Sequence, residues 1–203
     1  MSVAFYDDNA RVFIEQTRDV DMESLYERFC SLLPDHGSVL DVGSGSGRDA
    51  LAFKQMGYEV VAFDASIEMV EATRRYANVE THHARFEDFT SEQRFDGIWA
   101  CASLLHVRRG SLGFVLERFG SLLKKGGAFY LSFKMGEQER EKDGRYFNDM
   151  DERLLTALVA DVPSVEVHEI WITEDRRPER SSERWLNAML TKAVHNESSQ
   201  PHD

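Results

Sequence analysis

The sequence predicts an α/β domain in which a mostly parallel sheet is covered by helices on both faces. Short apolar runs alternate with segments of helical periodicity between residues 38 and 133. A glycine-rich stretch, Gly43 to Gly47, stands between the first apolar run and the helical pattern that follows it. The second apolar run ends on Asp64. Strands that alternate with helices in this way imply parallel strands joined by crossover helices.

Apolar spacing and helix signals assign the elements of the first half. A helix is expected over residues 5–18 and another over 22–33, before Pro34. Ser66 is a suitable N-cap for a helix at 66–77, and Glu68 favours the dipole of its first turn. The other expected elements are a helix at 47–56 and strands at 38–41, 59–63 and 79–82.

The second half continues the alternation. A strand is expected at 95–100 and a helix at 111–124, which Gly126 and Gly127 end before a strand at 128–133. A helix near 150–160 ends before Pro163. Residues 165–173 alternate like a strand, and 185–192 are predicted to be the last strand, with a short helix as the alternative. Residues 195–203 are polar, and we expect a disordered tail.

The composition is that of one globular domain. A chain of 203 residues, of which 42% are hydrophobic and 30% charged, is long enough for a substantial core. No window approaches a membrane span, and the first residues lack the apolar core of a signal peptide. Two cysteines give no disulfide framework, which fits a cytoplasmic location. The net charge of −12 argues against broad contact with nucleic acid.

The glycine-rich stretch and the acidic residues beside it indicate a nucleotide-like ligand. Glycines lack Cβ, so the backbone of such a loop can approach a ligand closely. Asp64 stands where a doubly wound sheet holds a ribose. A dinucleotide motif counted from Gly43 would need a third glycine where Arg48 stands. Asp41, just before the glycines, suits a ligand with a cationic ammonium or sulfonium group better than a pyrophosphate.

The pattern D-x-G-x-G-x-G over residues 41–47, followed by Asp64, resembles the class I S-adenosylmethionine-dependent methyltransferases. The resemblance continues through residues 95–101 and 122–131, and it is best between residues 37 and 133. It implies a Rossmann-like sheet of seven strands in the order 3-2-1-4-5-7-6, with the seventh strand antiparallel. It also implies one domain over residues 1–194, in which 1–33 form a helical cap, 37–133 the cofactor-binding core, and 134–194 the substrate-side loops and last strands.

This resemblance implies S-adenosylmethionine as the cofactor. Asp41 would lie near its amino-acid moiety, and Asp64 would accept hydrogen bonds from both ribose hydroxyls. Where the family often has an acidic and then a small residue beside the adenine, this sequence has Arg85 and Phe86. The acidic pair that follows Phe86 is the alternative acceptor for the adenine amino group. The other cofactor-binding residues that the resemblance implies are Gly43, Ser44, Gly45, Gly47, Ala65, Ser66 and Cys101.

Two reactive side chains follow the strand at 95–100. The resemblance to small-molecule members makes His106 the candidate catalytic residue, which orients a substrate or takes a proton. A nucleophilic Cys101 with His106 as its base is an alternative, although a cysteine in such a place more often lines a pocket as a small hydrophobe. The N/D-P-P-Y/F tetrapeptide of enzymes that methylate exocyclic amines of bases is absent. His82 and His83 have no cluster of ligands nearby, so no metal site is expected.

The loops at 134–149 and 174–184, with the N-terminal helix, are expected to form the substrate walls. Residues 137–143 are interpreted as a mobile surface loop, whereas the ends of this segment combine charge with ring surface. The arginines of 174–184 are interpreted equally well as a solvated face or as a site. Clustered arginines suit a small anionic substrate. The candidate substrate residues are Tyr6, Lys134, Arg145, Tyr146, Arg176 and Arg184.

The sequence therefore predicts methyl transfer from S-adenosylmethionine to a small acceptor by in-line displacement, and an anionic acceptor suits the arginines. The subgroup that it resembles is the small-molecule enzymes of the tellurite-resistance and ubiquinone-methyltransferase-like kind. One alternative is an RNA or protein methyltransferase, and another is a non-catalytic protein that binds the cofactor. Arg48 and Asp41 disfavour a nicotinamide-dependent dehydrogenase.

Overall fold

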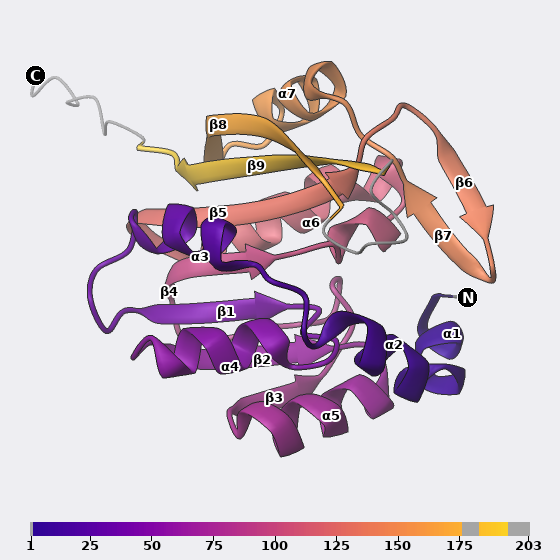
Figure 1. Ribbon diagram of the computed structural model, residues 1–203. Coiled ribbons are helices and arrows are strands. Elements are labelled where there is room, and N and C mark those ends of the chain that lie inside the picture. The colour runs from indigo at the N-terminus through magenta and orange to yellow at the C-terminus, as the bar shows by residue number, and fades with distance from the viewer. Residues whose placement is uncertain (1, 176–182, 195–203) are drawn as a thin grey trace, which may run out of the picture.

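Figure 1 shows the computed structural model, which describes residues 2–175 and 183–194. Seven strands form one sheet in the order β3-β2-β1-β4-β5-β9-β8. Their bounds are β1 Ser38–Val42, β2 Glu59–Asp64, β3 Glu80–His83, β4 Phe95–Ala100, β5 Leu123–Lys134, β8 Val165–Glu174 and β9 Arg184–Lys192. Six of these strands run in the same direction, and β9 runs antiparallel to them. Because β8 and β9 are the sixth and seventh strands of this sheet, the predicted order 3-2-1-4-5-7-6 is confirmed.

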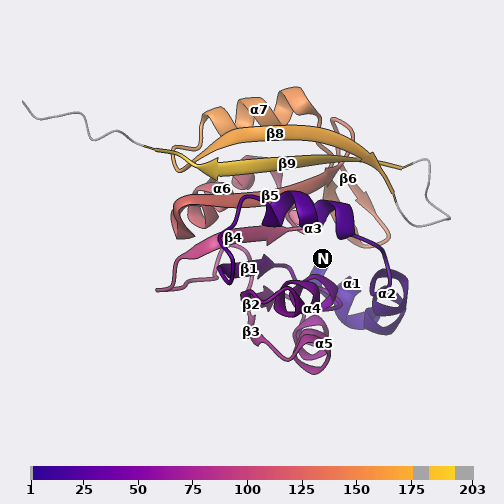
Figure 2. The ribbon, with the colours of Figure 1, turned by 60° about the vertical axis from the view of Figure 1, so that its left-hand side comes forward.

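Helices cover both faces of the sheet. The helices α3, α4 and α5 lie on one face, and α6 and α7 lie on the other (Figures 1 and 2). The first two helices, α1 and α2, lie beyond the edge of the sheet at which β1 and β4 end. The bounds are α1 Ser2–Asp8, α2 Ala10–Thr17, α3 Glu23–Cys30, α4 Arg48–Gln55, α5 Ile67–Ala77, α6 Arg109–Leu122 and α7 Glu152–Ala160, with a short 3₁₀ turn, η1, at Leu104–His106.

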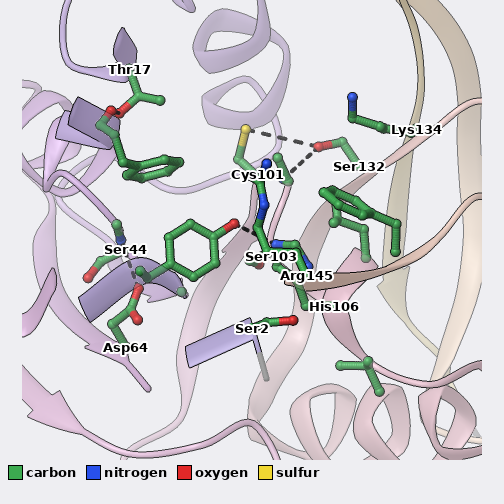
Figure 3. A pocket seen from close by; sticks show the side chains of 18 of the residues that line it. Ser2, Thr17, Ser44, Asp64, Cys101, Ser103, His106, Ser132, Lys134 and Arg145 are labelled. Atoms are coloured by element: carbon green, nitrogen blue, oxygen red, sulfur yellow. Dashed lines mark hydrogen bonds between the residues drawn. The ribbon is translucent and has the colours of Figure 1, made fainter. Parts of the chain in front are cut away.

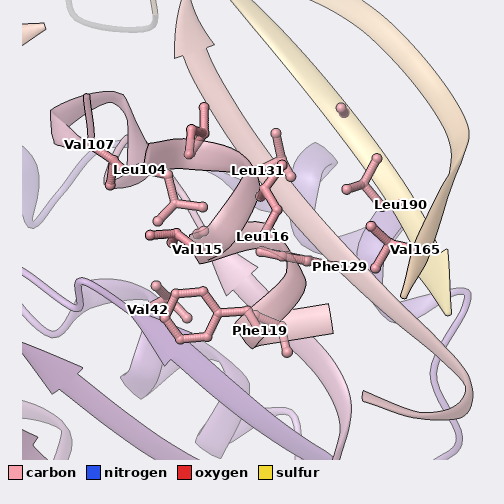
Figure 4. Close-up of a cluster of buried hydrophobic side chains, with 14 of the residues drawn as sticks. Val42, Leu104, Val107, Val115, Leu116, Phe119, Phe129, Leu131, Val165 and Leu190 are labelled. Carbon is pink, nitrogen blue, oxygen red and sulfur yellow. The ribbon is translucent and has the colours of Figure 1, made fainter. Parts of the chain in front are cut away.

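The core has one large cluster of apolar side chains on each face of the sheet. Phe119 of α6 packs against Phe63 on one face of the sheet. Phe129 packs against Phe119 in the same cluster (Figure 4). On the opposite face, Phe53 of α4 and Trp99 of β4 pack together with aromatic side chains of α3. Every residue of β1 is buried, as expected for a central parallel strand that is covered on both sides.

Two local predictions are confirmed in detail. Ser66 caps α5, because its Oγ accepts a hydrogen bond from the backbone N–H of Met69 at 3.2 Å. Residues 184–192 form a strand and not a helix, since β9 pairs along its length with both β5 and β8.

Two predicted boundaries are wrong. The helix expected at 5–18 is two helices, broken at Asn9, whose side-chain amide donates to the carbonyl of Phe5 at 2.9 Å and so competes with helical hydrogen bonding. The helix expected at 111–124 ends instead at Leu122, and the chain enters β5 at Leu123. Gly126, with φ of 78°, lies in an irregularity of β5 between the pairs that Leu123 and Ala128 make with β4.

The segment expected to be a long loop at 134–149 contains a β-hairpin. Its strands are β6 (Glu139–Lys142) and β7 (Arg145–Asn148), and they form a separate two-stranded sheet. Asp143 and Gly144 join them with φ of 51° and 72°, the left-handed pair that a tight two-residue hairpin requires. The Asp-Gly pair was the sequence signal for this hairpin, and it makes 137–143 part of a folded element.

Arg176 and the tail at 195–203 lie outside the described residues. Within the part of the chain that the structure describes, no helix is long and apolar enough to cross a membrane. The same residues hold no group of three or more side chains that could bind a metal ion.

Candidate functional site

A cleft of about 570 Å³ opens at the carboxyl ends of β1, β2 and β4, the place where doubly wound sheets bind ligands. Its walls come from α1 and α2, the glycine loop, the ends of β4 and β5, and the hairpin β6–β7. In the view of Figure 3, Ser44 and Asp64 lie on one side of the cleft, Ser132 and Lys134 lie on the other, and His106 and Arg145 lie between them.

The glycine loop adopts a backbone that other residues rarely adopt. Gly43, Gly45 and Gly47 have φ of 77°, 52° and 78°. Gly43 and Gly45 line the cleft, as does Ser44, so main chain faces the space where a ligand would lie. Gly47 does not line it. Gly47 is the N-cap of α4, and a Cβ there would lie 2.9 Å from Cα of Thr73.

Asp64 is held at the rim of the cleft by two backbone hydrogen bonds. Its Oδ2 accepts from the N–H of Gly45 at 3.0 Å, and its Oδ1 accepts from the N–H of Ser66 at 2.9 Å. Ser66 in turn donates to Asp7 of α1 at 2.6 Å. Burial raises the pKa of Asp64. Asp64, Ala65 and Ser66 all line the cleft, and the carboxylate keeps lone pairs for further donors.

Asp41 lies behind the glycine loop and does not line the cleft. The residue is 2% exposed, and its Oδ2 has no hydrogen-bond partner within 2–175 and 183–194. Burial, and then the charge of Asp49, raise the pKa of Asp41 well above its usual range. An unsatisfied buried carboxyl is costly, and a cationic ligand nearby would offset that cost.

A buried ion pair, Arg48 with Asp49, forms another wall and was not predicted from the sequence. Arg48 donates to the Asp49 carboxylate through Nε at 2.6 Å and Nη2 at 2.9 Å, and through Nη1 to the carbonyl of Thr17. Asp49 also accepts from the hydroxyl of Tyr26 and from the indole of Trp99 at 2.9 Å. The one feature of the sequence that could have indicated this ion pair is that two charged residues stand in the first turn of a helix whose following residues are apolar.

Arg85, Phe86 and Cys101, which the sequence analysis expects around the cofactor, also line the cleft. Arg85 is exposed, and the ring of Phe86 packs edge-on against Phe63 with centroids 6.1 Å apart. Burial raises the pKa of the Cys101 thiol to about 12. Cys101 is therefore a neutral thiol at physiological pH, a state that disfavours a nucleophilic role.

His106 lies at the contact between the N-terminal helix and the hairpin. Its Nδ1 is 2.7 Å from the carbonyl oxygen of Tyr146, and its Nε2 is 2.6 Å from the hydroxyl of Tyr6. Burial lowers the pKa of His106 to about 4, with a smaller contribution from the charge of Arg145. The imidazole is therefore neutral at pH 7.

The predicted substrate residues are brought together only in part. Tyr6, Lys134, Arg145 and Tyr146 line the cleft. Lys134 forms an ion pair with Glu183, and the hydroxyl of Tyr146 donates to Glu139. Arg184 is exposed and does not line the cleft, because alternation along β9 turns its neighbour Trp185 inward instead.

Within the described ranges of the chain, the charge of Arg145 has no close counterion and only one carboxylate at the limit of an ion pair. Its side chain is 17% exposed, and its guanidinium lies over the rings of Phe5 and Phe147, 4.0 Å and 5.2 Å from their centroids. The nearest carboxylate is that of Asp143, 4.0 Å away and 62% exposed. Its Nε is buried without a hydrogen-bond partner among the residues described.

Comparison with known proteins assigns the central part of the chain. Residues 39–127 match the model of a family described as a methyltransferase domain. The matched segment contains the glycine loop, Asp64 and His106, whereas the hairpin β6–β7 lies beyond it.

One curated relative is an uncharacterized methyltransferase of Staphylococcus carnosus, 27% identical over 117 residues, which are 57% of this chain and 56% of that protein. The chain spans about half the length of the curated relatives it matches. Among solved structures, the fold is shared with a 1,6-didemethyltoxoflavin-N1-methyltransferase of Burkholderia thailandensis that has S-adenosylhomocysteine bound. The TM-score is 0.76 and the sequence identity 22%, and the match covers 95% of this chain and 86% of that one. A [4+2]-cyclase, SpnF, shares the fold as well, at TM-score 0.74 and 15% identity with 96% of both chains covered, so the fold alone does not set the reaction.

Proposed function

We propose that this protein transfers the methyl group of S-adenosylmethionine to a small acceptor. The observation that carries the proposal is the carboxylate of Asp64 held against the backbone of Gly45 at the mouth of the cleft, within the segment that matches the methyltransferase family. Asp64 would accept hydrogen bonds from the ribose hydroxyls, and the backbone at residues 43–45 would contact the methionine part of the cofactor. The unsatisfied carboxyl of Asp41 favours a cationic group nearby.

The cofactor supplies a methyl group that its sulfonium already activates, so the protein needs no nucleophile of its own. The chain's contribution is to align the acceptor with the sulfur–methyl bond and to exclude water. The N-terminal helices and the hairpin β6–β7 enclose the cleft for that purpose. The neutral thiol of Cys101 fits this view, since no covalent protein intermediate is required.

We propose further that the acceptor carries an anionic group. Three cations surround the ring of Phe147 at the cleft wall: Lys134, Arg140 and Arg145. Lys134 is paired with Glu183 and Arg140 with Asp149, which leaves Arg145 to hold an anion. For the finer assignment, we predict a small-molecule enzyme of the tellurite-resistance and ubiquinone-methyltransferase-like kind. We predict further that it acts in the cytoplasm and forms one domain over residues 1–194.

A mass-spectrometric search with purified protein, S-adenosylmethionine and a small-molecule extract tests the proposal. We expect one extract component to gain a methyl group while S-adenosylhomocysteine accumulates. A thermal-shift comparison runs beside it, because a selective ligand at a hundred times its dissociation constant stabilises a protein by about 2.7 kcal/mol. Stabilisation by nicotinamide cofactors and not by S-adenosylhomocysteine would contradict the proposal. Methylation of RNA or protein in the extract would agree with methyl transfer from S-adenosylmethionine but would contradict the proposal that the acceptor is a small molecule.

A further inference from the structure

The hydroxyl of Tyr6 and the imidazole of His106 are joined across a hundred residues of sequence, at 2.6 Å. We propose that these two side chains form a proton relay, in which the Tyr6 hydroxyl contacts the nucleophilic atom of the acceptor and His106 receives the proton through it. This inference rests on the proposed function and assigns Tyr6, and not His106, as the catalytic residue that touches the acceptor. His106 acts through Tyr6 and is a positioning residue.

The hydrogen bonds of His106 define its tautomer. The carbonyl oxygen of Tyr146 can only accept, so Nδ1 of His106, 2.7 Å away, must carry the hydrogen. A neutral imidazole has one hydrogen, so Nε2 is the accepting nitrogen. The Tyr6 hydroxyl therefore donates to Nε2. The main chain of β7 thus fixes the imidazole of His106 so that the lone pair of Nε2 is directed at Tyr6.

This arrangement leaves no direct route from His106 to an acceptor. Nδ1 is occupied by the carbonyl of Tyr146 and Nε2 by the hydroxyl of Tyr6. A phenolic oxygen that donates its own hydrogen has two lone pairs with which it can accept. Because Tyr6 and His106 both line the cleft, an acceptor N–H or O–H can reach His106 through Tyr6.

The proton transfer balances without any further reactant. The lone pair of the acceptor atom forms the new bond to the methyl carbon, and the sulfur–methyl bond breaks with its electron pair going to sulfur. The proton leaves the acceptor atom for the oxygen of Tyr6 as the phenolic proton moves to Nε2 of His106. The imidazolium then releases a proton to solvent after the product leaves.

The charges around His106 determine when it can accept that proton. Tyr6 faces it from α1, and Arg145 and Tyr146 face it from β7; Lys134, at the end of β5, is paired with Glu183. The charge of Arg145 disfavours the imidazolium. An anionic group of the acceptor, placed on Arg145, would neutralise that charge. The base would then become stronger when the substrate is bound.

Nitrogen NMR of the protein with bound S-adenosylhomocysteine tests the relay without knowledge of the acceptor. We expect His106 at pH 7 as the neutral tautomer with hydrogen on Nδ1. Tyr6→Phe, which keeps the ring, should move the Nε2 resonance toward that of an unbonded nitrogen, whereas Tyr76→Phe on α5 should leave it unchanged. Benzoate should raise the pKa of His106 in the native chain and not in Arg145→Gln. A hydrogen on Nε2, or a charged imidazole at pH 7, would overturn the relay.

Turnover on the extract component that is methylated gives the second test. Tyr6→Phe and His106→Gln should each lower kcat by on the order of 10²-fold and abolish the acid limb of its pH profile. The double variant should be no slower than either single one, since both act in one step. The dissociation constant of S-adenosylhomocysteine should change less than about twofold. Full turnover by Tyr6→Phe would refute the relay and leave the proposed function intact. If the native chain does not bind S-adenosylhomocysteine, the proposed function itself is refuted.

Discussion

The carboxylate of Asp64 accepts a hydrogen bond from the backbone N–H of Gly45 at 3.0 Å, so the end of β2 and the loop after β1 form one unit. A second hydrogen bond, from the N–H of Ser66, fixes the orientation of the same carboxylate. This contact explains how two sequence motifs nineteen residues apart become one binding edge.

Asp64→Ala should weaken S-adenosylhomocysteine strongly while the fold persists. Each hydrogen bond to a charged group contributes about 1.5–3 kcal/mol, so loss of two ribose contacts corresponds to an affinity loss of about 10²-fold or more. Isothermal titration calorimetry measures this effect. Asp8→Ala, an exposed carboxylate of α1, is the matched control and should bind as the native chain does. Unchanged affinity of Asp64→Ala would remove Asp64 from the site.

Asp49→Asn should be more damaging to stability than Tyr26→Phe. The first change leaves the buried guanidinium of Arg48 without its counterion, at a cost of about 3–5 kcal/mol. The second removes one hydrogen bond to a carboxylate, at a cost of about 2 kcal/mol. Urea unfolding of both variants checks the order. The reverse order would show that the ion pair adds little to the fold.

His106 should make the protein less stable as the pH falls from about 6.5 to about 4. Its folded-state pKa, about 4, lies below the value near 6.5 of an unfolded chain, so the unfolded state binds the proton first. At pH 5 the loss is about 2 kcal/mol. His106→Asn should remove this part of the pH dependence, as followed by thermal unfolding between pH 4 and 7. An unchanged profile in the variant would place the loss in other groups.

Gly47 and Gly45 of the glycine loop and Gly144 of the hairpin turn should differ in their response to alanine. Gly47→Ala forces Cβ against the backbone of Thr73 in addition to the left-handed conformation, and should cost about 2 kcal/mol or more. Gly45→Ala meets only the ring of Phe13, at 3.2 Å, and should mainly weaken cofactor binding. Gly144→Ala, with open space at its Cβ, reports the cost of the backbone conformation alone. Equal destabilisation by all three would contradict this ranking.

Cys101→Ala should retain most of the activity. Burial keeps the Cys101 thiol protonated, with a pKa of about 12, so it offers no nucleophile near pH 7. We expect kcat of the variant within about threefold of the native value. We also expect S-adenosylmethionine to label the native chain no faster than the variant. A loss of about 10²-fold or more, with binding intact, would restore the nucleophilic alternative.

The sheet was predictable because its signals are local and strong. Buried central strands are continuous apolar runs, and the helix caps are set by single residues such as Ser66. The same kind of local signal singled out Gly43, Gly45 and Asp64, which line the cleft. The strand order came from the family resemblance, because pairing between distant strands leaves no mark on one sequence.

The structural features that the sequence analysis missed depend on contacts between distant residues or on a short turn signal. Asp143-Gly144 is the turn pair of a hairpin, but the charged strands around it lack the apolar alternation that reveals a strand. The pairing of Arg48 with Asp49, and of Asp49 with Trp99, depends on how α4 packs against β4. Tyr6 was expected at the cleft as a wall residue, while its contact with His106 required the folded structure.

The structure of a complex with S-adenosylhomocysteine tests the central claim most directly. We expect the ligand in the cleft, with its ribose hydroxyls on Asp64 and its sulfur directed toward Tyr6. Its amino-acid part should lie beside the glycine loop and Arg48. A ligand bound elsewhere, or an empty cleft at saturating concentration, would contradict it.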